Sequence, residues 1–346
     1  MTMGELNKKR VVWIDYAKAF AMLFVIIGHV ETGSRLTTWL YSFHMPLFFF
    51  LSGITLKADR GGKYQYIDKL LKRIIGAYLA YSILYFIYDV VQVIILHKEI
   101  DLIKTFCGIF VQMRGTEWSI GLWFLPLLFI TEIFVHVLIT KIESRQYLIM
   151  LLATAAGFLY ARMSRQVLPW GIDAVPIAAL FVWLGYCYKS KTIFNRLHEE
   201  VSLKLRMILC LTALLINLIV GKWNVILIGG SVDMHKMIYG NPALYIIAAI
   251  SGIIFISLVC QILSTRLTSR LLQYIGENTL HIYCIHGLVL AVIKKIYEII
   301  QQAEQFVCNS IGIQLLIACG TLSFCLIIIY VYTVTKRIAF AFFYNS

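Results

Sequence analysis

Long apolar stretches are the feature that most constrains the fold of this chain of 346 residues. A helix needs about 20 consecutive apolar residues to cross the hydrocarbon core of a bilayer, which is about 30 Å thick. Because lipid offers no partner to a free backbone N–H or C=O, such stretches must be helical. The sequence predicts an all-α, polytopic transmembrane bundle of about ten spanning helices, at residues 12–30, 40–56, 74–96, 120–140, 147–160, 174–188, 205–221, 242–263, 275–293 and 312–334.

The composition agrees with a membrane protein. Only 14% of the residues are charged, whereas a soluble domain has about 25%. No linker or low-complexity tract divides the chain, so we expect residues 1–346 to form a single domain. The second, fifth and sixth predicted spans are short, and we expect them to tilt little or to lie inside the bundle.

The basic residues are distributed unevenly between the predicted loops. The net charge is +13, and most of the 31 lysines and arginines lie in the segments that face the cytoplasm if the N-terminus does. The positive-inside rule then predicts that both termini are cytoplasmic. We expect a multi-pass protein of a bacterial-type cell membrane. Topology and anionic lipids explain this charge, so no nucleic-acid partner is predicted. The cysteines lack zinc-type spacing, and no metal is predicted.

Three ionisable residues of the first predicted helix share one face. Asp15, Lys18 and His29 lie within about 60° of one another at 100° per residue, and Asp15 and His29 are about 21 Å apart along the axis. Ionisable residues inside a bilayer are costly and are candidates for function. The alternative for Asp15 and Lys18 is an ion pair that stabilises helix packing.

The second predicted helix brings His44 to the same end of the bundle as His29. A neutral imidazole can accept a proton from a hydroxyl near pH 7, as a general base does. Pro46 permits a bend close by, so a purely structural hydrogen bond of His44 fits equally well.

A basic cluster precedes the third predicted span. Lys69, Lys72 and Arg73 lie within little more than one helical turn, and such a cluster can bind a phosphate or pyrophosphate. The alternative is that these charges only set the topology.

The sequence resembles the acyltransferase-3 family, especially its fucose 4-O-acetylase-like branch. The opening motifs WIDYAKAFAMLFVIIGHV and YSFHMPLFFFLSGITLK carry most of this similarity. Weaker matches follow in order: LWFLPLLF at 122–129, DAVPIAALFVWLGY at 173–186, YGNPALYIIAAISGI at 239–253 and IGENTLHIYCIHG at 275–287.

The resemblance implies an integral membrane enzyme that takes an acyl group, usually acetyl, from cytoplasmic acyl-CoA. The acceptor would be a hydroxyl of a glycan or lipid-linked sugar at the outer side. By the family pattern His29 is catalytic, Asp15 belongs to the same motif, and Lys18 stands where the family often has arginine. The basic cluster would bind the phosphates of the coenzyme, although its spacing is not a clean RxxR and Ala77 replaces a common proline.

We expect the phosphates of acetyl-CoA to stay at the inner rim while its pantetheine arm enters the bundle. His29 would then deprotonate the acceptor hydroxyl, either for direct transfer or beside a covalent acyl-histidine. His44 or Trp123 is expected to stabilise the oxyanion. Glu117, Trp118 and Asp173 are expected sugar contacts, with Trp118 equally suited to anchoring at the membrane interface.

The main alternative function is a proton-coupled secondary transporter, which ten helices and a polar intramembrane face would also suit. Transporters often show two related halves with helices broken at matching positions, and the sequence shows neither clearly. The acyltransferase interpretation is therefore the one we test against the structure.

Overall fold

The computed structural model describes residues 11–30, 34–57, 63–117, 119–164, 166–190, 201–304 and 311–344. Within these ranges the chain is helical, apart from loops and an isolated antiparallel bridge between Asp233 and Ile238. The helices are α1 (Val12–Val30), α2 (Arg35–Tyr41), α3 (His44–Thr55), α4 (Lys63–Leu70), the π-helical η1 (Leu71–Ile75), α5 (Gly76–Leu96), α6 (Leu102–Val111), α7 (Phe124–Lys141), η2 (Glu143–Arg145), α8 (Gln146–Met163), η3 (Pro169–Ala174), α9 (Val175–Ser190), α11 (Leu203–Ile228), α12 (Pro242–Arg266), α13 (Arg270–Glu277), α14 (Thr279–Glu304) and α15 (Ile311–Tyr344).

The predicted class, an all-α polytopic bundle, is confirmed. Among the described residues, nine helical stretches are long and apolar enough to cross a membrane. The predicted span at 40–56 is instead divided at Ser42 and Phe43 into α2 and α3. With 12 residues, α3 is only about 18 Å long, and most of its side chains are buried. It lies inside the bundle.

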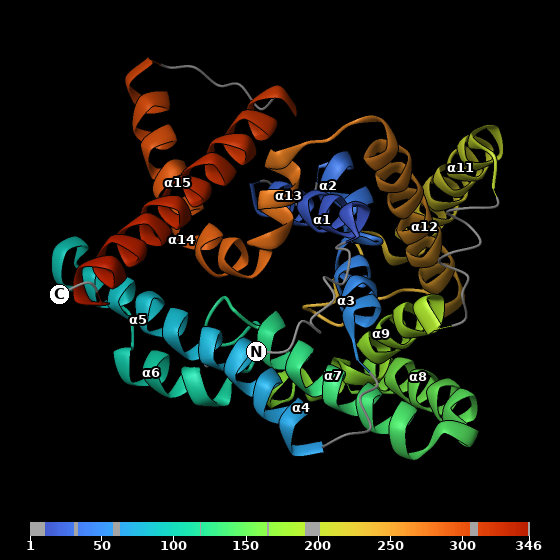
Figure 1. Cartoon of the computed structure of the whole chain (residues 1–346). Helices are drawn as coiled ribbons and strands as arrows, with labels where there is room; N and C mark the ends of the chain where they lie inside the picture. The colour runs from blue at the N-terminus through green and yellow to red at the C-terminus, as the bar shows by residue number, and fades with distance from the viewer. Residues whose placement is uncertain are drawn as a thin grey trace.

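Helix α1 forms the centre of the bundle, with α13, α12 and α3 around it (Figure 1). Its packing against α13 is close, because a Cβ on Gly276 would lie only 2.2 Å from the carbonyl oxygen of Asp15. Helix α3 runs opposite to α1, since Ser52 and Thr55 near its C-terminus line the same cavity as Lys18. We call this the Lys18 end of the bundle and the opposite one the His29 end. The cytoplasmic placement of both termini stays a prediction.

Glycines allow α3 and α9 to touch along their backbones. A Cβ on Gly53 would lie 1.9 Å from the carbonyl oxygen of Val182, and one on Gly185 would lie 2.0 Å from that of Phe50. Small residues at helix contacts are the usual means of close packing in a membrane, where burial from water gives no driving force between helices. This contact fixes α3 between α1 and α9.

Candidate active site

A cavity of about 310 Å³ extends into the bundle beside α1. Helix α1 contributes Lys18 and Val25 to its wall, which are seven residues apart and therefore lie on one face of the helix. Apolar side chains form much of the remaining wall, among them Phe124 from α7 and Tyr283 from α14, whose ring centroids are 5.4 Å apart. The cavity thus begins at a charged end and continues along the face of α1 that carries Lys18.

The charged end of this cavity holds a buried carboxylate. Glu132 of α7 is only 5% exposed at its side chain and accepts hydrogen bonds from Ser52 Oγ, Tyr66 Oη (3.2 Å) and Arg73 Nη2 (3.2 Å to each oxygen). Lys18 lines the same cavity from the α1 side. Glu277 of α13 lines the cavity too, so Lys18 and Arg73 share its wall with two carboxylates. The N–H donors of Lys18 and Arg73 are suited to the oxygens of an anionic ligand.

The three residues of the predicted basic cluster do not point the same way. Arg73 lines the cavity, whereas Lys72 Nζ pairs with Asp68 at 2.8 Å on the exposed surface. Lys69 is exposed. The described lining therefore includes one member of the cluster, together with Lys18. A shared role of all three in binding phosphate stays a prediction.

His29 lies at the other end of the same α1 face. It follows Val25 by one turn, a rise of about 6 Å, and its side chain is exposed. Its ring contacts that of His286, with centroids 5.3 Å apart, and Lys294 Nζ donates to its carbonyl oxygen at 2.8 Å. Tyr283 connects the two regions, because it lines the cavity and contacts the His286 ring at 5.5 Å.

Two further histidines near His29 are held by main-chain carbonyls. His286 is buried, and its Nδ1 donates to the carbonyl oxygen of Tyr283 at 2.6 Å. His44 is also buried, and its Nδ1 donates to the carbonyl oxygen of Leu40 at 2.9 Å. A carbonyl only accepts, so a neutral ring held in this way keeps its Nε2 unprotonated. Nε2 is thus the atom of each ring that is able to accept a proton.

Asp15 is not among the described residues that line the cavity, although its main chain packs on Gly276, which does line it. The side chain of Asp15 is buried, and the main chain at Asp15 packs against Gly276 of α13. Of the described residues on α1, the cavity wall takes Lys18 and Val25 rather than Asp15. The catalytic role predicted for Asp15 stays a prediction, and its observed position is at a helix contact.

Two of the predicted sugar contacts, Trp123 and Asp173, are connected through His235, because Trp123 contacts its ring and Arg114, the partner of Asp173, donates to its carbonyl oxygen. Glu117 is exposed and pairs with Lys104 Nζ at 2.7 Å. Trp123 is half-buried, and its ring meets that of His235 with centroids 5.2 Å apart. Trp118 lies outside the described residues. Trp123 thus contacts His235. His235 in turn lies within electrostatic range of His29.

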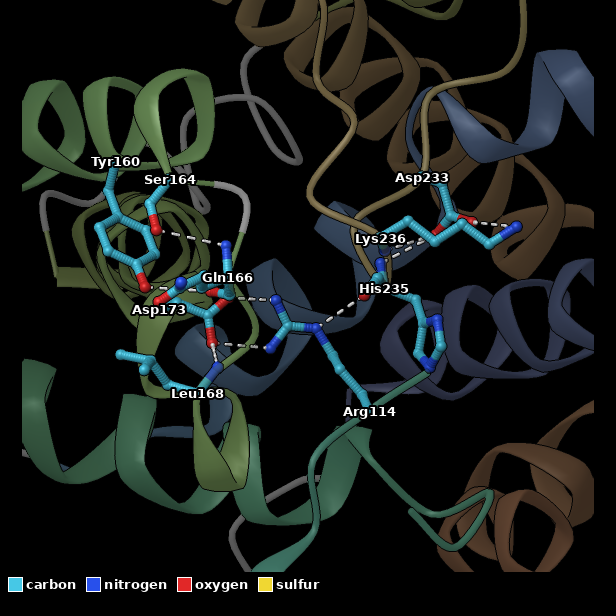
Figure 2. Close-up of polar contacts among 9 residues, drawn as sticks. All are labelled: Arg114, Tyr160, Ser164, Gln166, Leu168, Asp173, Asp233, His235 and Lys236. Atoms are coloured by element: carbon cyan, nitrogen blue, oxygen red, sulfur yellow. Dashed lines mark hydrogen bonds and ion pairs between the residues drawn. The ribbon is translucent and has the colours of Figure 1, made fainter. Parts of the chain in front are cut away.

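Asp173 forms a buried ion pair (Figure 2). Both of its carboxylate oxygens accept from Arg114, with Nη1 to Oδ1 at 3.0 Å, and Oδ1 also accepts from the backbone N–H of Leu168. Arg114 Nε in turn donates to the carbonyl oxygen of His235 at 2.8 Å. Arg114 thus joins η3 to the loop between α11 and α12. The role predicted for Asp173 in sugar binding stays a prediction.

The loop that carries His235 is shaped by Asp233. Its Oδ1 accepts from the backbone N–H groups of His235 (2.9 Å) and Lys236 (3.3 Å). Burial lowers the pKa of His235, and the positive charges of Arg114 and Lys236 act in the same direction, while Asp233 opposes them. Burial therefore favours the neutral form of the His235 ring.

Sequence reasoning missed Glu132, Arg114 and the contact of His286 with His29. Glu132 is an ionisable residue inside an apolar span, which is the same signal that selected Asp15, Lys18 and His29 on α1. Arg114 had no comparable signal, because it lies in a predicted outer loop and nothing in the sequence distinguishes it from the other basic residues of the loops. The proximity of His286 to His29 depends on how α1 and α14 pack.

The comparison with protein families matches nearly the whole chain. Residues 11–330 match the acyltransferase-3 family, whose description is an acyltransferase domain. No curated protein matches the chain. The match includes α1, the cavity and the loops at the His29 end.

Proposed function

The chain belongs to the acyltransferase-3 family and is a membrane acyltransferase, and we propose that it transfers an acyl group, acetyl in the first instance, from acyl-CoA to a hydroxyl of a glycan or lipid-linked sugar. One observation carries the proposal. The cavity is lined by Lys18 and Arg73 and, on the same face of α1 as Lys18, by Val25, which lies one helical turn before the exposed His29.

The cavity suits the donor at both of its ends. The diphosphate of acyl-CoA would meet Lys18 and Arg73, because these cations bind phosphate oxygens by charge-assisted hydrogen bonds. The slender, uncharged acyl-pantetheine arm would lie along the apolar part of the wall formed by Val25 and Tyr283. The bulky, charged nucleotide would stay at the Lys18 end, which the distribution of basic residues assigns to the cytoplasm.

His29 would act as the general base. Its imidazole takes the proton of the acceptor hydroxyl as the hydroxyl oxygen bonds to the thioester carbonyl carbon. When the tetrahedral intermediate collapses, the C–S bond breaks and the thiolate takes the proton from the imidazolium. His286 supports the ring of His29 from one side. Trp123 Nε1–H would stabilise the oxyanion, and His44 could do so only as an imidazolium, because its Nδ1–H is bound to the carbonyl oxygen of Leu40. An acyl-histidine intermediate would use the same residues.

The acceptor would approach at the His29 end, which faces the outside of the cell membrane in the predicted topology. Trp123 and His235 offer ring faces for a sugar there. The half-buried carboxylate of Asp233 lies within electrostatic range of His29 and is suited to sugar hydroxyls. Contacts of Glu117 and Trp118 with the sugar stay part of this proposal.

Purified protein in lipid vesicles tests this proposal. With acetyl-labelled acetyl-CoA inside and oligosaccharides extracted from cell surfaces outside, we expect labelled sugar and free thiol in equal amounts. Replacing His29 with alanine should reduce transfer by at least about 10²-fold, the typical contribution of a positioned base.

His97→Asn is the matched control, because His97 is exposed at the end of α5 with φ 50°, which asparagine tolerates. This variant should transfer normally. Near-normal transfer by a folded His29→Ala protein would exclude the base, and transport of intact ligand without thiol release would favour a transporter.

A further inference from the structure

The buried carboxylate of Glu132 lines the cavity, and the reaction proposed above gives it no role. Glu132 lies on α7, within a membrane-spanning helix, where a charged side chain is costly and usually marks function. Its hydrogen bonds come from three different elements, α3 (Ser52), α4 (Tyr66) and η1 (Arg73). The carboxylate therefore gathers polar groups of separate helices at the Lys18 end of the cavity.

Arg73 is the partner of Glu132 that reaches the cavity. Its side chain is 56% exposed, against 5% for Glu132, and it gives only Nη2 to the two carboxylate oxygens. Glu132 therefore leaves Nη1 and Nε of Arg73 without a bond to it. A guanidinium held at one nitrogen keeps its other donors for a phosphate, in the fork geometry that such groups recognise.

The structure around Glu132 keeps this arrangement in place. The π-helical turn Leu71–Ile75 carries Arg73, and such turns alter the side-chain register of a helix and recur at functional sites. Tyr66 donates to Glu132 and stacks on His136, with centroids 4.0 Å apart and planes at 11°. Because His136 follows Glu132 by one turn of α7, Tyr66 binds α4 to the same face of α7.

We propose that Glu132 is a positioning residue for the acyl donor: it holds Arg73 at the mouth of the cavity so that the free edge of the guanidinium binds a phosphate of acyl-CoA. This inference rests on the proposed function, because it assumes that the donor enters at the Lys18 end. Glu132 acts on donor binding through Arg73, and it touches neither the thioester nor the acceptor.

Steady-state kinetics and direct binding of coenzyme A test this role. In Glu132→Gln, which keeps the shape and removes the charge, the KM for acetyl-CoA and the Kd for free coenzyme A should rise about tenfold, the loss expected for a hydrogen bond between charged groups. The kcat should stay within about twofold. Glu298→Gln is the matched control, since Glu298 is exposed, lies outside the cavity wall and forms a surface ion pair with Lys295 on α14.

A double-mutant cycle separates positioning from a general structural effect. If Glu132 acts through Arg73, then adding Glu132→Gln to Arg73→Gln should raise the KM no further. Additive effects in this cycle, an unchanged KM, a lower KM or an equal fall in kcat would each overturn the proposal. If Glu132→Gln is not monodisperse in detergent, Tyr66→Phe takes its place, because it removes one hydrogen bond to Glu132. We then expect a smaller rise in the KM for acetyl-CoA, and an unchanged KM would overturn the proposal.

The two levels of inference fail in different ways. If the wild-type protein neither binds coenzyme A nor releases thiol from acetyl-CoA, the proposed function is wrong, and the positioning role is wrong with it. If the wild type does both and Glu132→Gln behaves like Glu298→Gln, only the role of Glu132 is wrong.

Discussion

Replacing Asp173 with asparagine removes the charge that balances Arg114. Asp173 has no exposed side-chain surface and Arg114 is 1% exposed, so neither charge is solvated by water. Asparagine has almost the same volume as aspartate and still accepts a hydrogen bond from the N–H of Leu168. The principal change is therefore an uncompensated guanidinium in a buried site, with an amide N–H₂ turned towards one of its nitrogens.

The magnitude follows from the burial of both partners. Removing one member of a buried ion pair costs about 3–5 kcal/mol, because the remaining charge has lost its counter-charge and cannot reach water. Arg114 retains its hydrogen bond to the carbonyl oxygen of His235, which does not replace the lost charge. We therefore expect Asp173→Asn to lower the free energy of unfolding by about 3–5 kcal/mol.

Equilibrium unfolding in mixed micelles, with a rising fraction of denaturing detergent and tryptophan fluorescence as the signal, measures this difference. Glu298→Gln is the control, because the pair of Lys295 and Glu298 is exposed and such pairs contribute little. A loss below about 1 kcal/mol for Asp173→Asn, similar to that of an exposed pair, would refute the reasoning and show that water reaches Arg114.

Two further predictions follow from packing and from protonation. Gly185→Ala should lower the free energy of unfolding by at least about 1–3 kcal/mol, because its Cβ would meet the backbone of Phe50 at 2.0 Å. In contrast, Gly320→Ala on α15, with nothing within 4 Å, should stabilise by about 0.5–1 kcal/mol; equal melting temperatures would contradict this. Burial lowers the pKa of His235 in the folded protein, so the unfolded chain binds a proton that the folded protein does not. The resulting stability is present above the unfolded pKa and is lost as the pH falls below about 6.5 towards the folded pKa. The wild type should therefore lose more stability than His235→Gln between about pH 8 and pH 5.5, and parallel pH dependences would contradict the assignment.

Helix positions were predictable because their signals are local. The first helix was expected at 12–30 and is found at Val12–Val30, since an apolar run of this length must form a hydrogen-bonded helix in lipid. Asn241 and Pro242 mark the start of α12 at the expected residue, with the Asn241 side chain accepting from two backbone N–H groups. Segment 40–56 deviated because its residues are buried by α1, α9 and α12 and not by lipid.

The sequence alone determined that this chain is a helical membrane protein of the acyltransferase-3 family, and that Lys18 and His29 share a face of α1. Only the tertiary structure decided which side chains come together: Glu132 with Arg73, His286 with His29, and Arg114 with Asp173. The physical reason is that lipid and protein interior are both apolar. In a bilayer the hydrophobic pattern therefore does not reveal which side of a helix packs against a neighbour, whereas it does so in water.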